Sequence, residues 1–427
     1  MSYRGPRGTY DVYPGDASRQ EPHERPDLWA WVQNLASDHF RRYNFSEVRT
    51  PIFEDLELFA RSSGETSDVV TKEMFEFTDK GGREMALRPE GTPGVVRAYV
   101  QHGLHGLAQP FKMWYFGPMF RHERQQRGRY RQHTQIGAEV LGSGDPLVDA
   151  EVIALLYGIH QAVGVREEVV HLNNLGDIQT RERYVPELRA FLERHRSELD
   201  HDSVARLERN PMRTFDSKDP NTQAVLEEAP LVGDFLSDDA TAHLEAVKCG
   251  LEALGIPYQI DGRLVRGLDY YTSTVFGAKS PVLGAQDTVG AGGRYNGLIQ
   301  ALGGPDLPGI GFGSGVERIL LAAADHEPDS SLDVYFVTLA PDARVPALRL
   351  AGALRERGIS CDLDYGGRGA KGQFKQADRS GADFVVVIGE DELAAGSLTL
   401  RDMGSGDESK VSGGSESLVA AIGKGGR

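Results

Sequence analysis

The chain has 427 residues, of which 40% are hydrophobic and 26% are charged, and its formal net charge is −16. This length predicts about two or three domains, and the acidic balance argues against unspecific coating of nucleic acid. The two cysteines, Cys249 and Cys361, are far apart and form no CxxC pair, so neither a disulfide framework nor a cysteine zinc site is supported. No apolar run is long enough to span a membrane and no signal-peptide pattern opens the chain, so we expect a cytoplasmic protein with no membrane partner.

The N-terminal part passes from irregular to helical to strand-like sequence. Residues 1–25 are polar and rich in Arg, Gly and Pro, which predicts an irregular arm. From Asp27 onward, apolar residues recur at helical spacing. Residues 45–50 then predict a strand, and residues 52–62 predict a second, shorter helix.

A hairpin follows, and it ends in a turn that is rich in proline and glycine. Residues 71–87 predict two strands joined at 80–83. Glu90 and Thr92 lie just beyond the second strand, and Thr92 suits the cap of a helix that has proline at its first position. A simple capped turn and a substrate site explain this stretch equally well on local evidence.

Residues 111–142 form a stretch in which two predicted strands flank a cationic loop. An apolar run over 111–116 predicts a buried strand that Gly117 and Pro118 break, and residues 135–141 predict the second strand. The loop has one acid, Glu123, and five arginines: Arg121, Arg124, Arg127, Arg129 and Arg131. A solvated hairpin tip would also be charged, but here the arginines do not alternate with acids. The loop therefore favours binding of a polyphosphate or a nucleic acid.

The middle of the chain changes character twice. Residues 146–163 predict a helix and 166–175 a strand, whereas about 176–256 are charged, glycine-poor and helical in pattern. This block predicts a helical insertion into a larger domain that contains β-strands. Strand-like sequence resumes at 258–275, and the glycine-rich segment 290–297 predicts a turn.

Four alternating glycines, Gly309, Gly311, Gly313 and Gly315, mark the next strand. Period two puts all four on one face, which is left bare so that a flat ring can lie against the backbone, while the larger residues between them pack the core. Arg318 begins a helix beside that bare face. The spacings of the dinucleotide fingerprint and of the phosphate-binding loop are absent, so a nucleotide would bind by another scheme.

After residue 330 strands alternate with helices, which predicts a parallel or mixed α/β sheet. Residues 397–401 predict an edge strand. Residues 403–415 are rich in Gly and Ser and predict a mobile tail before a short apolar segment.

Over essentially its whole length the chain resembles the class II aminoacyl-tRNA synthetases, and within them the histidyl-tRNA synthetase family. Residues 45–51 with the preceding helix resemble motif 1, residues 120–123 with their loop resemble motif 2, and residues 309–318 resemble motif 3. Two further segments, 266–271 (RGLDYY) and 292–297 (GGRYNG), resemble the motifs that distinguish the histidyl-tRNA synthetases from other class II synthetases.

The resemblance implies a mixed α/β fold with an α+β catalytic domain at residues 1–325, built on an antiparallel sheet flanked by helices. It also implies an α/β anticodon-binding domain at 330–427. The implied activity is ATP-dependent attachment of L-histidine to tRNA(His) through histidyl-adenylate, with release of AMP and pyrophosphate. The expected partners are ATP with Mg²⁺, L-histidine, tRNA(His) and a second copy in a homodimer that motif 1 builds; no zinc is expected.

The resemblance also implies site residues. Arg121 holds the α-phosphate, Arg318 holds the γ-phosphate, and Arg266 bridges the substrate carboxylate and the α-phosphate; arginine suits these roles because it stays charged and grips oxyanions bidentately. The expected histidine-binding residues are Glu90, Thr92, Gln135, Glu139, Arg266, Tyr270 and Tyr271. The expected ATP-binding residues are Arg121, Glu123, His133, Gly313 and Arg318. The residues expected to contact the tRNA acceptor end are Arg124, Arg127 and Arg129.

One position departs from the family pattern. His133 stands where the family usually has an aromatic residue that stacks on adenine, and an imidazole can also stack. Glu123 is expected to read the adenine amino group.

Two other functions are open to such a chain. One is a synthetase-like regulatory subunit of histidine biosynthesis without aminoacylation activity, and the other is a module that only binds RNA. Regulatory paralogues lack the anticodon-binding domain and parts of the catalytic motifs. This chain keeps Arg121, Arg266 and Arg318 and continues well past residue 330, which favours the ligase.

Overall fold

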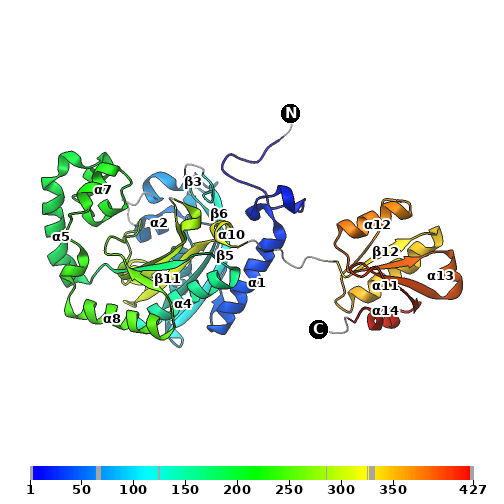
Figure 1. The fold of residues 1–427 in the computed structure, drawn as a ribbon. Helices are drawn as coiled ribbons and strands as arrows, with labels where there is room; N and C mark the ends of the chain where they lie inside the picture. Colours follow the sequence, from blue (N-terminus) through cyan, green and yellow to red (C-terminus); the bar gives the residue numbers. More distant parts are fainter. Residues whose placement is uncertain are drawn as a thin grey trace. The chain divides into compact units, whose positions relative to one another are not determined.

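A computed structural model describes residues 3–63, 69–123, 126–284, 286–324, 326 and 332–423. The chain divides into two compact units, residues 1–326 and 327–427 (Figure 1). In the described ranges, no helix is both long enough and apolar enough to cross a membrane.

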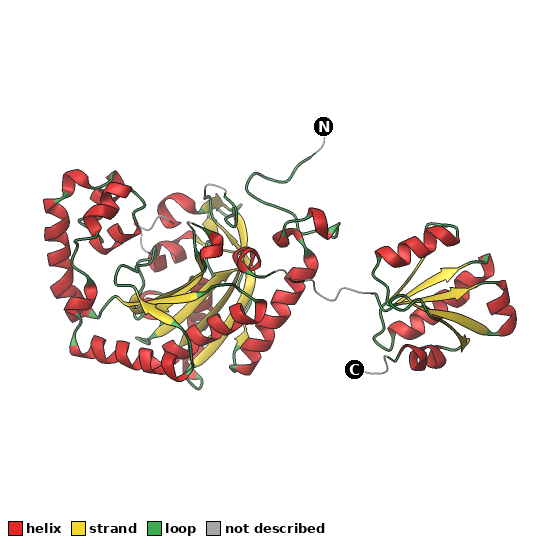
Figure 2. Ribbon diagram, in the orientation of Figure 1, coloured by secondary structure: helices red, strands yellow, loops and turns green. Residues whose placement is uncertain are grey.

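An eight-stranded sheet forms the centre of the first unit, with helices outside it (Figure 2). Neighbouring strands run antiparallel except in the pairs β1–β5 and β7–β8. In spatial order the strands are β1 (Ser46–Glu47), β5 (Phe111–Phe120), β6 (Gln132–Leu141), β11 (Gly309–Gly315), β10 (Thr288–Arg294), β9 (Thr272–Lys279), β7 (Val169–Asn174) and β8 (Tyr258–Ile260).

One face of this sheet carries the main hydrophobic core. Side chains alternate along each strand, so Trp114 of β5 and both Ile310 and Phe312 of β11 point to the same core. The helices that supply residues to it are α1 (Pro26–Arg42), α4 (Pro146–Val163), α8 (Asp238–Ala253) and α10 (Val316–Ala322). As its spacing predicts, α1 turns Leu28, Val32, Ala36 and Phe40 inward.

The opposite face of the sheet is only partly covered. Met113 and Tyr115 of β5 point to this side and pack with residues of α3 (Thr92–Gln101) and α9 (Leu298–Ala301). Glu139 of β6 and the glycines of β11 share this face, because Gly311 pairs with Glu139 in register. We call it the site face.

A buried ion pair ties α4 to β10. Arg294 is 1% exposed, and its guanidinium lies 2.6 Å from Asp149 and donates to the carbonyl oxygens of Ser143 and Asp145, each at 2.9 Å. Buried ions are tolerated when hydrogen bonds satisfy them in this way. Arg294, which belongs to the 292–297 segment, therefore has a structural role in the interior of the unit.

The insertion packs around a separate apolar cluster, which also includes Val275 of β9 (Thr272–Lys279). Its helices α5 (Ile178–Arg194), α6 (His201–Arg206) and α7 (Pro220–Leu226) pack with the short helices η6 (Pro211–Asp216) and η7 (Val232–Phe235). Figure 1 shows α5 and α7 at one end of the unit. By contrast, α8 returns to the main core, where it places Val247 and Leu251.

The stretch around motif 1 differs from the expected strand and helix. β1 has only two residues, and the expected helix at 52–62 begins with a strand, β2 (Phe53–Asp55), before α2 (Leu56–Ser63). β2 joins β4 (Glu84–Leu87) and β3 (Phe75–Thr78) in a three-stranded sheet. The pairing with β4, which comes later in the chain, overrides the local helical pattern.

Two expected breaks are absent from the main sheet. β5 continues through Gly117 and Pro118, because β1 pairs only with Met113 and Trp114, and proline is tolerated where a strand has no partner on one side. The expected turn at 290–297 is mostly strand: β10 runs to Arg294 between β9 and β11, and only Gly297 has the positive φ of a tight turn.

The second unit is built on a five-stranded sheet with the order β13-β12-β14-β15-β16. Its elements are β12 (Val334–Thr338), α11 (Arg344–Arg355), β13 (Cys361–Leu363), α12 (Ala370–Arg379), β14 (Phe384–Ile388), α13 (Glu390–Ala395), β15 (Ser397–Asp402), β16 (Glu408–Ser412) and α14 (Ser415–Ile422). β13, β12 and β14 are parallel, as predicted. The expectation of a mobile tail was wrong, because β16 pairs with β15 and takes the edge of the sheet.

Candidate active site

Two adjoining pockets open on the site face of the first unit. Both are lined by Arg121, Gln135, Ala291 and Gly313, so these residues lie at the junction. Of the site residues that the resemblance implies, those that line the first pocket are Arg121, Glu123, Arg129, His133, Gln135, Gly313 and Arg318. Those in the second pocket are Glu90, Thr92, Arg121, Gln135, Arg266, Tyr271 and Gly313.

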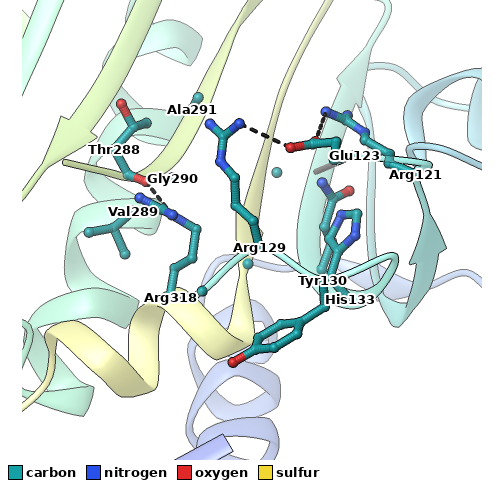
Figure 3. Close-up of a pocket in the computed structure, with 14 residues that line it drawn as sticks. Arg121, Glu123, Arg129, Tyr130, His133, Thr288, Val289, Gly290, Ala291 and Arg318 are labelled. Atoms are coloured by element: carbon teal, nitrogen blue, oxygen red, sulfur yellow. Dashed lines mark hydrogen bonds and ion pairs between the residues drawn. The ribbon is translucent and has the colours of Figure 1, made fainter. Parts of the chain in front are cut away.

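In the first pocket a carboxylate lies between two arginines (Figure 3). Glu123 accepts a hydrogen bond of 3.0 Å from Arg129, and its other oxygen lies 3.8 Å from the Arg121 guanidinium. Arg121 is also fixed by donation from Nε to the Pro89 carbonyl oxygen at 2.9 Å. Two cationic groups are thus held at one wall of the pocket.

Arg318 also lines the first pocket. Its guanidinium donates to the carbonyl oxygens of Thr288, at 2.7 Å, and Gln286. Burial, with a contribution from the Arg129 charge, lowers the pKa of Arg318 to about 10, so it stays protonated near neutral pH. Among the described lining residues Glu123 is the single acid against three arginines. This charge balance can hold a polyphosphate.

His133 supplies a neutral ring to the same pocket. Burial and the Arg121 charge lower its pKa to about 3. The ring is therefore uncharged near neutral pH and can stack on a flat base without adding a buried charge.

The glycine face of β11 is bare only over its second half. A Cβ at Gly309 would lie 2.3 Å from the Tyr295 ring, and one at Gly311 would lie 1.8 Å from a Glu139 oxygen. At Gly313 the nearest neighbour is Gln135 at 3.5 Å, an ordinary contact distance. The expectation that all four glycines leave free space is therefore corrected: two make room for side chains, and Gly313 lines both pockets.

Glu139 and Tyr270, which were expected to bind histidine, do not line either pocket. Glu139 has no solvent exposure and lies behind Thr92, which lines the second pocket. Its two oxygens accept hydrogen bonds from the Thr92 hydroxyl, at 2.7 Å, and from the Tyr295 hydroxyl. Thr92 was expected to cap α3, but the N-cap is Gly91, and the Thr92 hydroxyl is used in this contact instead. Burial raises the pKa of Glu139 to about 8, and the charge of Glu90 acts in the same direction.

Two tyrosines and a second acid complete this region. The Tyr270 hydroxyl donates to Glu90 at 2.7 Å, and the Tyr270 and Tyr271 ring centroids lie 4.6 Å apart. Carboxylates, hydroxyls and aromatic rings together suit a ligand that carries an ammonium group and a polar ring.

Arg266 enters the second pocket from the segment before β9. It donates to the Phe276 carbonyl oxygen, and its Nε has no hydrogen-bond partner in the part of the chain that the structure describes. A Cβ at Gly277 would lie 2.3 Å from this guanidinium, so a larger residue there would displace it. Burial lowers the pKa of Arg266. A carboxylate or a phosphate would satisfy the free nitrogen.

Two of the motif 2 arginines that were expected at the tRNA end, Arg127 and Arg129, have different surroundings. Arg129 lines the first pocket, whereas Arg127 is exposed and pairs with Glu21 at 3.2 Å. Arg124 lies outside the described residues.

Two tyrosines in the second pocket region were missed from the sequence. Tyr115 lines the pocket, and its ring occupies space that Gly91 and Gly137 leave: a Cβ there would lie 2.3 Å and 2.1 Å from it. Tyr295 contacts Glu139. The alternation of β5 places Tyr115 on the face opposite Trp114, and this signal could have found it.

The described residues contain no group of three or more His, Cys, Asp or Glu side chains that could hold a metal ion. A divalent cation such as Mg²⁺ prefers oxygen ligands and is often bound through substrate phosphates with one or two carboxylates. Glu123 is paired with Arg129. The donor set therefore fits a cation that arrives on a phosphate ligand, and not one held by the protein alone.

A family model described as Histidyl-tRNA synthetase matches residues 11–319 of the chain. The chain belongs to the histidyl-tRNA synthetase family. A second model, Anticodon binding domain, matches residues 333–422.

Whole-length relatives agree with this assignment. The chain is 75% identical over 422 residues to the histidine–tRNA ligase of Rubrobacter xylanophilus, covering 99% of this chain and 100% of the relative. It is 47% identical to the histidine–tRNA ligase of Levilactobacillus brevis, covering 96% and 95%. The crystal structure of apo S. aureus histidyl-tRNA synthetase superposes with a TM-score of 0.81 at 38% identity and covers 99% of both chains. The mixed α/β fold expected from the resemblance is thus confirmed.

Proposed function

We propose that the chain is a histidine–tRNA ligase, which activates L-histidine with ATP and transfers it to tRNA(His). The observation that supports this best is the junction of the two pockets. An arginine-lined pocket suited to a polyphosphate meets a pocket of acids and tyrosines, and Arg121 and Gln135 line both. A reaction that joins a phosphate to an amino acid needs such a junction.

In the activation step a histidine carboxylate oxygen attacks the α-phosphorus of ATP. The new O–P bond forms as the bond to the β-phosphate oxygen breaks, and pyrophosphate leaves with the electron pair. The protein mainly positions the reactants and stabilises the spreading negative charge. We assign Arg121 to the α-phosphate, Arg318 to the γ-phosphate, and Arg266, with its free nitrogen, to the carboxylate and the α-phosphate.

The second pocket receives histidine in this proposal. Glu90, Thr92 and Gln135 bind the α-amino group, and Glu139 with Tyr270 and Tyr271 surrounds the imidazole. The buried hydrogen bonds of Glu90 and Glu139 hold both side chains in place before the substrate arrives. A site with such fixed polar groups binds an amino acid whose side-chain ring can form hydrogen bonds better than one with an apolar ring of similar size.

The first pocket receives ATP. The neutral His133 ring stacks on adenine, Glu123 accepts from the adenine amino group, and the open backbone at Gly313 admits the flat base. Mg²⁺ would bind the ATP phosphates and neutralise part of their charge.

The remaining partners follow from the two units. The match of residues 333–422 to an anticodon-binding model supports binding of the tRNA anticodon there. The exposed Arg127 and the neighbouring Arg124 and Arg129 are proposed to meet the acceptor end. A cytoplasmic location accords with a role in translation.

We also propose a homodimer built through motif 1. Ile52 and Phe53 are 44% and 48% exposed, and Phe77 on the same small sheet is 42% exposed. The Phe53 and Phe77 ring centroids lie 6.2 Å apart, so these two rings form one apolar patch, which follows motif 1 in the chain. Exposed apolar patches of this kind mark contact surfaces. Sedimentation of the chain should show a dimer, and a fully active monomer would contradict this part of the proposal.

Charging of a tRNA(His) transcript with labelled histidine tests the function. The purified chain with ATP and Mg²⁺ should form histidyl-tRNA(His), and a transcript for another amino acid is the control. A regulatory subunit of histidine biosynthesis would charge neither transcript. The whole-length identity to histidine–tRNA ligases favours charging over that alternative.

A further inference from the structure

The N-terminal arm, residues 3–25, makes specific contacts with the loop between β5 and β6. The Arg131 amide donates to the Gly8 carbonyl oxygen at 2.7 Å. Gly8 has a φ of +86°, and a Cβ there would lie 2.8 Å from the Arg131 side chain. The arm also folds back on itself, because the Tyr13 amide donates to the Glu24 carbonyl oxygen at 3.1 Å. Its irregular sequence thus has a defined path.

Three rings join the arm to the loop, and we call them the arm cluster: Tyr10, His23 and Tyr130. Their centroids lie 4.6 to 4.9 Å apart in all three pairs. The Tyr130 hydroxyl and the His23 Nε2 atom are hydrogen-bonded at 2.9 Å, and His23 is 6% exposed. Tyr130 also lines the first pocket.

A single buried carboxylate connects the arm cluster to both sides of the first pocket. The Tyr10 hydroxyl donates to Glu317, and the same oxygen accepts the Thr134 amide at 2.8 Å. Glu317 is 1% exposed, and its other oxygen has no hydrogen-bond partner in the described ranges. Thr134 follows His133 on β6, and Arg318 follows Glu317 on α10. Each end of this contact is therefore one residue from a side chain that lines the pocket.

We propose that Tyr10 is a positioning residue for ATP, which holds Glu317 and the loop so that His133 and Arg318 stay directed into the first pocket. This inference rests on the proposed function. Tyr10 itself does not line either pocket. Removing its hydroxyl leaves a buried carboxylate with one donor fewer, and hydrogen bonds to charged groups are worth more than neutral ones. The loop and the start of α10 can then shift.

The matched variants are Tyr10→Phe, which keeps the ring, and Tyr13→Phe, which makes the same change at a 45% exposed position of the same arm. ATP–pyrophosphate exchange gives the KM values for ATP and for histidine. Tyr10→Phe should raise the KM for ATP by about tenfold and leave the KM for histidine within about twofold. Tyr13→Phe should change neither. An equal rise in both KM values, or no change in either, would overturn the proposal.

A measurement on the unaltered protein covers the case in which Tyr10→Phe does not fold. ATP should slow hydrogen–deuterium exchange in the arm together with residues 126–134. Protection of the strand β11 by ATP without protection of the arm would also overturn the proposal. If the unaltered protein shows no histidine-dependent exchange of pyrophosphate, the proposed function fails first, and that result is distinct from a failure of Tyr10 alone.

Discussion

Tyr270 donates a hydrogen bond of 2.7 Å to Glu90, although the two residues lie 180 positions apart in the chain. Both side chains are buried, at 9% and 5% exposure. Glu90 comes from the turn before α3, and Tyr270 comes from the segment before β9. The proposed histidine pocket therefore exists only when these two distant segments are packed together.

Loss of the Tyr270 hydroxyl should weaken histidine binding selectively. Tyr270→Phe removes the contact that fixes Glu90, so we expect the KM for histidine to rise by about tenfold with a much smaller change in the KM for ATP. Tyr258→Phe is the matched control, because its hydroxyl also donates to a glutamate, Glu252 at 2.8 Å, outside both pockets. Equal effects of the two substitutions would contradict the assignment of Tyr270.

Removal of the Arg266 guanidinium should slow activation far more than it weakens tRNA binding. Arg266→Ala takes away a buried donor that we propose is directed at charge developing during the reaction, and such losses cost about 10²–10³ in rate. Pyrophosphate exchange measures the first effect and filter binding of tRNA(His) measures the second. Arg263→Ala serves as the control, since Arg263 is exposed and donates to the Glu227 carbonyl oxygen at 3.2 Å. The role of Arg266 is wrong if tRNA binding falls as much as activation.

Glu139 should make stability depend on pH. Its pKa is raised from 4.5 to about 8 in the folded chain, so between these values the folded state holds more protons than the unfolded state. The free energy of unfolding then decreases as pH rises through this range. Glu139→Gln cannot ionise and lacks this decrease. The stability of Glu139→Gln relative to the unaltered protein should therefore rise by on the order of 3 kcal/mol from low to high pH.

Urea unfolding at about pH 5 and about pH 8 checks this expectation. Glu245→Gln, at an exposed carboxylate of α8, is the control and should show no such difference between the two pH values. A constant difference between Glu139→Gln and the unaltered protein at both pH values would refute the raised pKa.

Two glycine substitutions should separate fold from binding. A methyl group at Gly313 meets only ordinary contacts, so Gly313→Ala should fold normally. It enters the proposed adenine site, and since overpacking costs about 1–3 kcal/mol, the KM for ATP should rise by about tenfold. At Gly311 the same change places a Cβ 1.8 Å from Glu139 and should destabilise the fold. Thermal melting measures the stability of both variants, and pyrophosphate exchange measures their KM for ATP. An unchanged KM for ATP in Gly313→Ala would contradict the assignment of Gly313 to the adenine site.

Local sequence pattern predicted the elements that depend on their own periodicity. The bounds of α4 agree with the expected helix at 146–163, and β11 carries Ile310 and Phe312 to the core as expected. In these segments the spacing of the apolar residues directly determines which face of the element is buried.

The differences occur where a distant partner decides the structure. The local sequence predicts that Thr92 caps a helix, but its hydroxyl donates to Glu139 instead. Pro118 predicts the end of a strand, but the strand continues because β1 does not extend as far as Pro118. The polar sequence of the arm gave no sign that Tyr10 reaches Glu317, 307 positions away. The site residues were predicted from motif resemblance, and their assigned roles remain predictions that the experiments above address.

Histidine-dependent exchange of pyrophosphate into ATP tests the proposed function most directly. The assay needs no tRNA and reports only the joining of an amino acid to the α-phosphate, which the junction of the two pockets is proposed to perform. We predict exchange with L-histidine and none with other amino acids under the same conditions. Absence of exchange with histidine, or equal exchange with another amino acid, would contradict the account.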